Sequence, residues 1–229
     1  MNAQSVAIEK EDHRLRSARR KRERMRAHLL DAVLVVYPGD KSGTPAVIED
    51  VIRHAGVSRG TFYKYFRSLD EAVEELAAQL ADELGAACIE LYEDLQEPKL
   101  KVATGFQLFI SRAALDRNWA SFAAHLGHLT QGSGLLHAVG LDFTTGAQEG
   151  TFIFHDLEVT VDFVLGAMIE GIRRSMETPI SRRYIEVMAG MVLRSLGVSA
   201  NEADAVAAAA SLRLHREAPT RLPWWRPFD

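Results

Sequence analysis

Hydrophobic residues recur at intervals of three and four positions along nearly the whole chain, which is the spacing of an amphipathic helix. Over residues 15–37, for example, Met25, Leu29, Val33 and Val36 fall on one helical face. No stretch combines period-two alternation with the β-branched and aromatic residues typical of a strand. The pattern therefore predicts an all-α fold.

The second predicted helix covers about residues 44–55. Thr44 is expected to cap it, and Pro45 suits the first helical position, where its missing N–H is not needed. Its inward-facing stripe consists of Ile48, Val51, Ile52 and Ala55.

The third predicted helix is only about two turns long and follows a glycine turn. Gly56 can adopt the left-handed conformation that ends a helix. Ser58 is then a favoured N-cap for the next one. Phe62 and Phe66 lie four residues apart and are expected to point inward. The positions left facing outward are Arg59, Gly60, Thr61, Tyr63 and Lys64.

Two short helices joined by a glycine turn are typical of a helix-turn-helix. Arg59 can donate two hydrogen bonds to a guanine edge, and Thr61 can meet a base or a phosphate. Gly60 lets the backbone approach the groove closely, while Lys64 supplies charge to the DNA backbone. An ordinary short helix with solvated side chains explains the same positions, and the pattern alone leaves both interpretations open.

Residues 48–66, IEDVIRHAGVSRGTFYKYF, resemble the DNA-binding signature of the TetR family of bacterial transcription regulators. The resemblance implies an all-helical homodimer, with a three-helix DNA-binding domain over residues 1–67 and a larger ligand-binding and dimerisation domain over residues 68–229. The family often has threonine where Val47 stands, and that threonine caps the second helix and contacts a phosphate; here Thr44 is assigned both roles. The family also often has lysine where Leu69 stands, so one phosphate contact of the family is not expected at that position. By position, the residues implied to face operator DNA are Arg59, Gly60, Thr61, Tyr63, Lys64 and Tyr65.

Charge is unevenly distributed. Residues 1–67 hold 14 Lys or Arg against 8 Asp or Glu, giving +6, whereas the rest holds 13 against 23, giving −10. A basic segment on an acidic chain favours a nucleic-acid partner for that segment. The single cysteine, Cys88, excludes an intramolecular disulfide and suits the reducing cytoplasm. No apolar run approaches the length of a membrane span, and the N-terminus does not resemble a secretory signal.

Residues 14–26 carry eight Lys or Arg. One interpretation is a solvated helix end and tail. The other is an arm that follows phosphates or enters the minor groove beside the recognition helix. The sequence leaves both open.

Helical patterns continue to the C-terminus, over about residues 69–95, 99–115, 157–176, 181–197 and 199–213. Ser68 opens the first of these as a capping box with Glu71. Asn118 and Ser133 are expected to cap two shorter helices between residues 115 and 157. Aromatic stripes are more often core than ligand site, but pockets are lined by the same residue types. The candidate lining of an effector pocket is Phe106, Phe109, Trp119, Phe122 and Phe143.

The helices over 157–176 and 181–197 match the dimer-forming pair of the family by position and character. The stripes chosen as the dimer interface are Val161, Val164, Met168 and Ile172 on the first and Ile185, Met188 and Val192 on the second. The first helix carries another stripe, formed by Val159, Phe163, Gly166 and Glu170. The alternative is that both helices pack only within the subunit.

No motif for catalysis is found, so we expect a protein that is not an enzyme and has no cofactor. No carboxylate or cysteine lies at a metal-ligand spacing from His125, His128 or His137, which disfavours a metal site. The sequence thus predicts a cytoplasmic regulator, most often a repressor, that a small-molecule effector releases from a palindromic double-stranded DNA operator. The alternatives are a helical carrier or enzyme for apolar ligands and a DNA-binding protein that responds to no effector.

Overall fold

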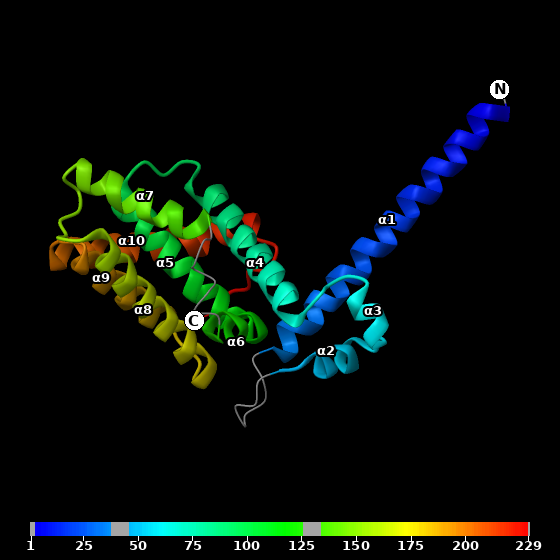
Figure 1. The fold of residues 1–229 in the computed structure, drawn as a ribbon. Coiled ribbons are helices and arrows are strands. Elements are labelled where there is room, and N and C mark those ends of the chain that lie inside the picture. The colour runs from blue at the N-terminus through cyan, green and yellow to red at the C-terminus, as the bar shows by residue number, and fades with distance from the viewer. Residues whose placement is uncertain (1–2, 38–45, 126–133, 229) are drawn as a thin grey trace. The chain divides into compact units, whose positions relative to one another are not determined.

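The computed structural model describes residues 3–37, 46–125 and 134–228 (Figure 1). Within these ranges every regular element is an α-helix, which confirms the predicted all-α fold. None of the described helices is long and apolar enough to cross a membrane. The chain divides into two compact units, residues 1–76 and 77–229. The sequence-based boundary was placed after residue 67.

The first unit contains three helices and the start of a fourth. Their bounds are α1 (Ala3–Val36), α2 (Ile48–Ala55), α3 (Arg59–Tyr63) and α4 (Leu69–Tyr92), the last of which continues into the second unit. Helix α2 packs against both α1 and α3. The unit has a small core because each helix turns its apolar stripe inward; its fully buried members include Leu29, Val33, Val51, Phe62 and Phe66.

The second unit is built around α5 (Pro98–Leu115), which packs most extensively against the helices that follow it in the chain (Figure 1). These are α6 (Arg117–His125), α7 (Gly134–Gln148), α8 (Leu157–Glu177), α9 (Arg182–Ser195) and α10 (Ala200–Arg221). Most of α5 is buried because neighbours cover it on several sides. Its face with Phe106 and Ile110 joins the main core, to which α8, α9 and α10 contribute.

The starts of α2 and α1 differ from the prediction. Helix α2 begins at Ile48, after an extended Val47, rather than at Pro45. Val47 has no side chain that could cap the helix, but the Asp50 carboxylate accepts the backbone N–H of Val47 at 3.1 Å, which is the reciprocal bond of a capping box. Thr44 lies outside the described residues. Helix α1 begins at Ala3, well before the predicted residue 15.

Asp116, not Asn118, caps α6. Its carboxylate accepts the backbone N–H groups of Asn118 at 3.1 Å and Trp119 at 3.0 Å. Both residue types are good caps, and helical spacing alone did not separate two candidates only two positions apart. Ser133, predicted to cap α7, lies outside the described residues.

The aromatic C-terminal tail packs on the second unit. Trp225 is buried, and its ring lies 5.3 Å from the ring of His215 on α10. The ring of Trp224 lies 4.9 Å from the guanidinium of Arg112, on α5. The tail therefore covers part of α10 and α5.

Candidate nucleic-acid interface

The turn between α2 and α3 is fixed by local chemistry. Gly56 has φ +64°, a left-handed conformation that glycine adopts without the usual steric cost. The Ser58 hydroxyl accepts the backbone N–H of Thr61 at 3.1 Å, as an N-cap does. These two residues set the direction in which α3 leaves the turn.

Two buried phenylalanines hold α3 against the core of the first unit. Phe62 and Phe66 are almost completely inaccessible, and their ring centroids are 5.6 Å apart. Burying a phenylalanine side chain contributes about 1.5–3 kcal/mol. The short helix is therefore held by its apolar side, and the opposite side is left to solvent.

Arg26 ties α1 to the segment after α3 and to the start of α4. Its guanidinium donates to the carbonyl oxygen of Tyr65 at 2.8 Å, pairs with the Glu75 carboxylate, and lies 4.4 Å from the ring of Phe66. The hydrogen bond to Glu75 raises the pKa of Arg26. Sequence reasoning placed Arg26 in the basic run, whereas the structure gives it a positioning role.

The outer face of α3 is as predicted for four of its residues. Arg59, Gly60, Tyr63 and Lys64 are exposed. Thr61 is half-buried, and its hydroxyl lies 2.9 Å from the Ser58 hydroxyl, so it is already engaged in the turn. Tyr65, which the family resemblance placed toward DNA, is also half-buried.

Arg59 is held against the protein surface. Its guanidinium pairs with the carboxylate of Glu49 on α2 and lies 5.8 Å from the ring of Tyr63. The hydrogen bond with the Tyr63 hydroxyl, followed by the charge of Glu49, raises the pKa of Arg59. Sequence reasoning missed Glu49, because nothing in the spacing of ten residues indicates the contact.

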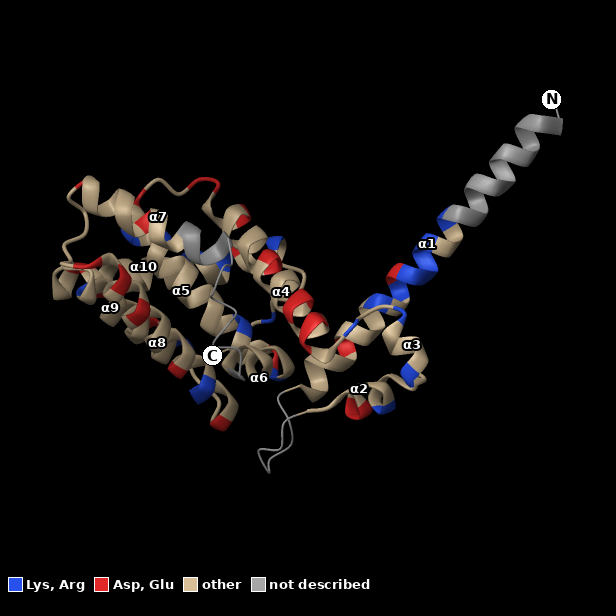
Figure 2. Cartoon of the chain, in the orientation of Figure 1, with Lys and Arg blue, Asp and Glu red and all other residues tan. Residues whose placement is uncertain are grey.

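The start of α4 is capped as predicted on one side. The Ser68 hydroxyl accepts the backbone N–H of Glu71 at 3.1 Å. The reciprocal bond differs: the Glu71 carboxylate accepts the backbone N–H of Arg67, at 2.5 Å, rather than that of Ser68. This hydrogen bond is the main cause of a lowered pKa for Glu71. Figure 2 shows Lys and Arg along α1 and at α3, and Asp and Glu gathered along α4.

The aromatic residues proposed to line a pocket are mostly core. Phe109 is half-buried and packs edge-on against Trp119, with ring centroids 6.4 Å apart. Phe143 packs in the same way on Phe152. The four fully buried members of the predicted set are Phe106, Trp119, Phe122 and Phe143. Of the five, Phe109 retains the most surface for a ligand.

Polar groups also meet inside the second unit. The Tyr92 hydroxyl donates to the carbonyl oxygen of Lys101 at 2.9 Å. Burial raises the pKa of Tyr92, and it raises that of Cys88, one turn earlier on α4, to about 11. Both groups are therefore protonated at neutral pH. Asp142 on α7 is half-buried, and its burial raises the pKa of its carboxyl.

No group of three or more metal-ligating side chains comes together among the residues searched in the structure. The side chains of the three histidines considered from the sequence, His125, His128 and His137, lie outside the described set. Cys88 is buried as a free thiol.

The stripes predicted to form a dimer interface lie largely inside the subunit. Val161, Met168 and Met188 are half-buried. The other four residues are almost inaccessible in the single chain: Val164, Ile172, Ile185 and Val192. A side chain buried in its own subunit has no surface to offer a second copy, so for these four the structure supports the intrasubunit alternative.

The apolar residues that α8 and α9 leave exposed are different ones. Val159 and Phe163 of α8 are exposed, as are Val187 and Met191 of α9. Val159 and Phe163 belong to the second stripe recognised on the 157–176 helix, together with the exposed Gly166 and Glu170.

Comparisons with known proteins agree with this geometry. Residues 41–76 match the profile described as "Bacterial regulatory proteins, tetR family". No match is found among curated proteins. RolR without ligand is a similar structure, with a TM-score of 0.64 and 22% identity over 80% of this chain and 95% of that chain.

Two further solved structures share the fold. FadR from Bacillus subtilis in complex with stearoyl-CoA has a TM-score of 0.56 and 20% identity, covering 76% of this chain and 99% of that one. RolR in complex with resorcinol has a TM-score of 0.62 and 23% identity, covering 82% and 95%.

The profile match covers the turn, all of α3 and the start of α4, which are the elements whose caps and anchors are described above. The resemblance seen over residues 48–66 is thus confirmed. The helix-turn-helix region of this chain matches the DNA-binding region of the tetR family, and the chain shares its all-helical fold with the solved structures named above.

Proposed function

We propose that the protein represses transcription by binding a palindromic DNA operator as a homodimer, and that a small molecule bound in residues 77–229 releases it. The observation that carries the proposal is the construction of α3. The helix is capped by Ser58 and anchored by Phe62, and it presents Arg59 and Lys64 to solvent. A helix of this kind reads the major groove with its N-terminal residues.

The exposed residues divide into two roles. Arg59 reads a base, because its planar fork matches the two acceptors of a guanine edge. Gly60 lets the backbone approach the groove, and Lys64 and Tyr63 bind phosphates, which position the protein without reading sequence. Thr61 and Tyr65 are half-buried, so they contact DNA only with the part of each side chain that remains exposed at the edge of this face. Thr44 contributes a phosphate contact from the preceding segment.

The dimer forms through the exposed residues of α8 and α9. A two-fold interface uses the same patch on both subunits. Val159, Phe163, Val187 and Met191 supply such an apolar patch on the two helices. A two-fold dimer delivers two copies of α3 to grooves about 34 Å apart, or a multiple of that distance.

The effector is a small molecule with an apolar body and a polar group. Phe109 and Asp142 are half-buried on α5 and α7, so both have surface left to offer a ligand. The similar structures include one with resorcinol and one with stearoyl-CoA. That proteins of this fold bind ligands as different as resorcinol and stearoyl-CoA supports a ligand-binding role for the larger unit. Release then follows if the effector prefers a dimer whose recognition helices are wrongly spaced for DNA.

Selection of duplexes from a random library by the purified protein tests DNA recognition, followed by fluorescence anisotropy on the selected duplex. Arg59→Ala is expected to relax the preference at one base pair per half-site, by about 1–3 kcal/mol. Lys64→Ala is expected to weaken selected and random duplexes alike and to lower the salt slope by about 1. Enrichment of no palindrome by the wild-type protein contradicts the proposal.

A further inference from the structure

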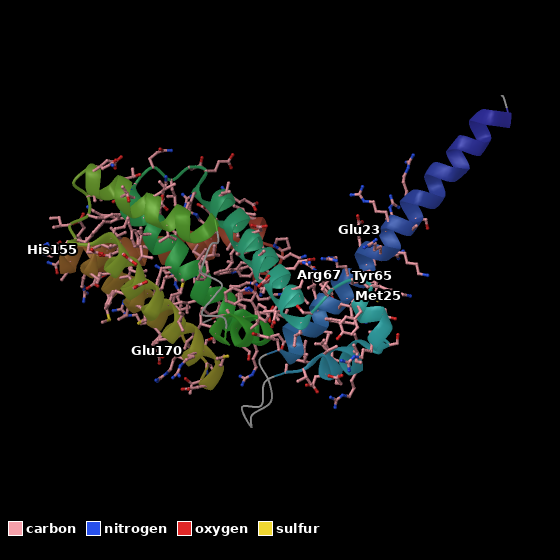
Figure 3. The ribbon with its side chains drawn as sticks, in the orientation of Figure 1. Glu23, Met25, Tyr65, Arg67, His155 and Glu170 are labelled. Atoms are coloured by element: carbon pink, nitrogen blue, oxygen red, sulfur yellow. The ribbon has the colours of Figure 1, made fainter. Side chains whose placement is uncertain are left out.

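Residues 16–24 of α1 lie on the surface of the first unit. Every side chain from Arg16 to Arg24 is exposed. Six of these nine residues are Lys or Arg, against one acid, Glu23, which pairs with Arg19 at 2.7 Å. Figure 3 labels Glu23 on this exposed part and the half-buried Met25 where α1 begins to pack.

This segment, residues 16–24, is a helix that is polar all round. Successive residues are rotated by about 100°, so the consecutive Arg19, Arg20, Lys21 and Arg22 place charge on every side. A helix that lies on a membrane surface needs an apolar face beside its basic one. Residues 16–24 contain no large apolar side chain. The charge pattern therefore fits a polyanion such as DNA and disfavours a lipid surface.

The helical state also decides how the segment can meet DNA. A helix with side chains is about 10–12 Å wide, whereas the minor groove of B-DNA is only about 6 Å wide. Residues 16–24 therefore cannot enter a minor groove in the conformation that they adopt, and their long side chains reach phosphates instead. This excludes one of the two DNA-binding modes left open by the sequence.

The segment is attached rigidly to the recognition unit. It continues without a break into the packed part of α1, which runs on to Val36. Directly after it, Arg26 is fixed to Glu75 and to the carbonyl of Tyr65. The direction of the segment is thus set relative to α3. Nine helical residues span about 13 Å, or roughly four base pairs at about 3.4 Å each.

We propose that residues 16–24 form a rigid helical arm that binds the phosphates of the DNA flanking each half-site, independently of sequence. The proposal rests on the proposed operator binding of α3. The arm would lengthen the stretch of DNA that each subunit contacts. It would also account for a large share of the salt dependence of DNA affinity, because each phosphate contact releases counterions.

The test uses the full-length protein and the variant R20Q/K21Q/R22Q. All three residues are exposed, and glutamine has a helix propensity close to that of Lys and Arg, so the fold is retained. The matched control is R173Q/R183Q/R216Q, which removes the same charge from exposed sites on α8, α9 and α10.

The probes are a duplex selected by the wild-type protein, the same duplex with eight extra base pairs on each side, and a random-sequence 30-base-pair duplex. Dissociation constants are measured by anisotropy between 50 and 300 mM KCl. We expect the wild type and the control to bind the extended duplex more tightly than the short one. The arm variant is expected to lose this difference, and its salt slope is expected to fall by about 0.9 per lost contact.

An unchanged salt slope and an unchanged flank effect in the arm variant overturn the proposal, while sensitivity to Arg59→Ala still supports operator binding. If the wild type selects no sequence, operator binding fails, and the salt slopes on the random duplex still decide the role of the arm. Flotation with vesicles containing 30% phosphatidylglycerol provides a last check. Arm-dependent binding to vesicles, with unchanged DNA slopes, also overturns the proposal in favour of a membrane surface.

Discussion

The guanidinium of Arg59, at the first position of the recognition helix α3, is paired with the carboxylate of Glu49 on α2. Its other terminal nitrogen lies 3.5 Å from the Tyr63 hydroxyl. The side chain best suited to reading a guanine is therefore engaged within the protein when DNA is absent. Contact with a base requires Arg59 to exchange the Glu49 carboxylate for the base edge.

Glu49→Gln is expected to tighten operator binding by up to about fivefold, because exposed ion pairs are weak. Both partners of the pair are more than half exposed. Removal of the carboxylate frees Arg59 and takes a negative charge away from the DNA. Glu74→Gln, an exposed site on α4, is the matched control for charge. Anisotropy on the selected duplex measures the effect, and weaker binding by the Glu49 variant would show that Glu49 does not compete with DNA for Arg59.

Two glycines of the helix-turn-helix are expected to respond in opposite ways to alanine. Gly56 has φ +64°, so Gly56→Ala costs about 1–2 kcal/mol of stability although no atom lies near the added Cβ. Gly60 is helical, and the added Cβ would lie 3.9 Å from the Ser58 hydroxyl, an ordinary contact. Gly60→Ala should therefore keep or raise stability and weaken DNA binding, since the methyl group lies where the backbone approaches the groove.

Urea unfolding and anisotropy separate the two effects. Loss of stability in the Gly60 variant would show that the helix packs more closely there than the structure indicates. Normal DNA binding by a stable Gly60 variant would show that this backbone does not approach the groove.

Local features of the fold could be predicted from the sequence. The left-handed Gly56, the Ser58 cap and the inward Phe62 and Phe66 all follow from chemistry within about ten residues, and the structure has each of them. Capping and helical periodicity depend on near neighbours in the chain, so one sequence contains the information. For the same reason the solvent-facing position of Lys64 could be read directly.

Contacts between helices could not be predicted in the same way. The pairing of Arg26 with Glu75 depends on how α1 crosses α4, which no local pattern specifies. The orientation of α8 was hidden by its composition, because two of its faces are apolar. Only packing against α5 and α9 decides that Val164 is inside and Phe163 outside.

These adjacent residues of α8 provide a test of the dimer. Phe163 is 57% exposed and Val164 is 6% exposed. Phe163→Glu is expected to convert a dimer into a folded monomer, because a charge on the patch opposes its burial against a second copy. Val164→Glu is expected to unfold the second unit, because a carboxylate enters an apolar core without a partner.

Light scattering after size exclusion reports the mass, and far-UV circular dichroism reports the fold. A Phe163→Glu protein that remains dimeric would contradict the proposed interface. If wild-type protein is monomeric at micromolar concentration, the two-fold operator model fails with it.

His215 gives a pH dependence that can be worked out from its contacts. Its Nδ1 donates to the carbonyl oxygen of Ser211 at 2.9 Å, while its Nε2 is buried and has no hydrogen-bond partner. The ring lies 5.3 Å from the rings of both Trp225 and Phe228. Burial lowers the pKa of His215 below 6.5, because a proton on Nε2 would have no acceptor.

The unfolded chain therefore binds the proton more tightly than the folded one, and the free energy of unfolding falls as pH drops below about 6.5. The lowered pKa of Glu71 acts in the same direction, but only near and below its ordinary value of 4.5. We expect urea unfolding between pH 7.5 and 5.5, followed by tryptophan fluorescence, to show this loss in the wild type. His215→Phe, which keeps the aromatic contacts with the tail, should make the curve flatter in that window. If the two proteins lose stability in parallel, His215 is not the group that titrates.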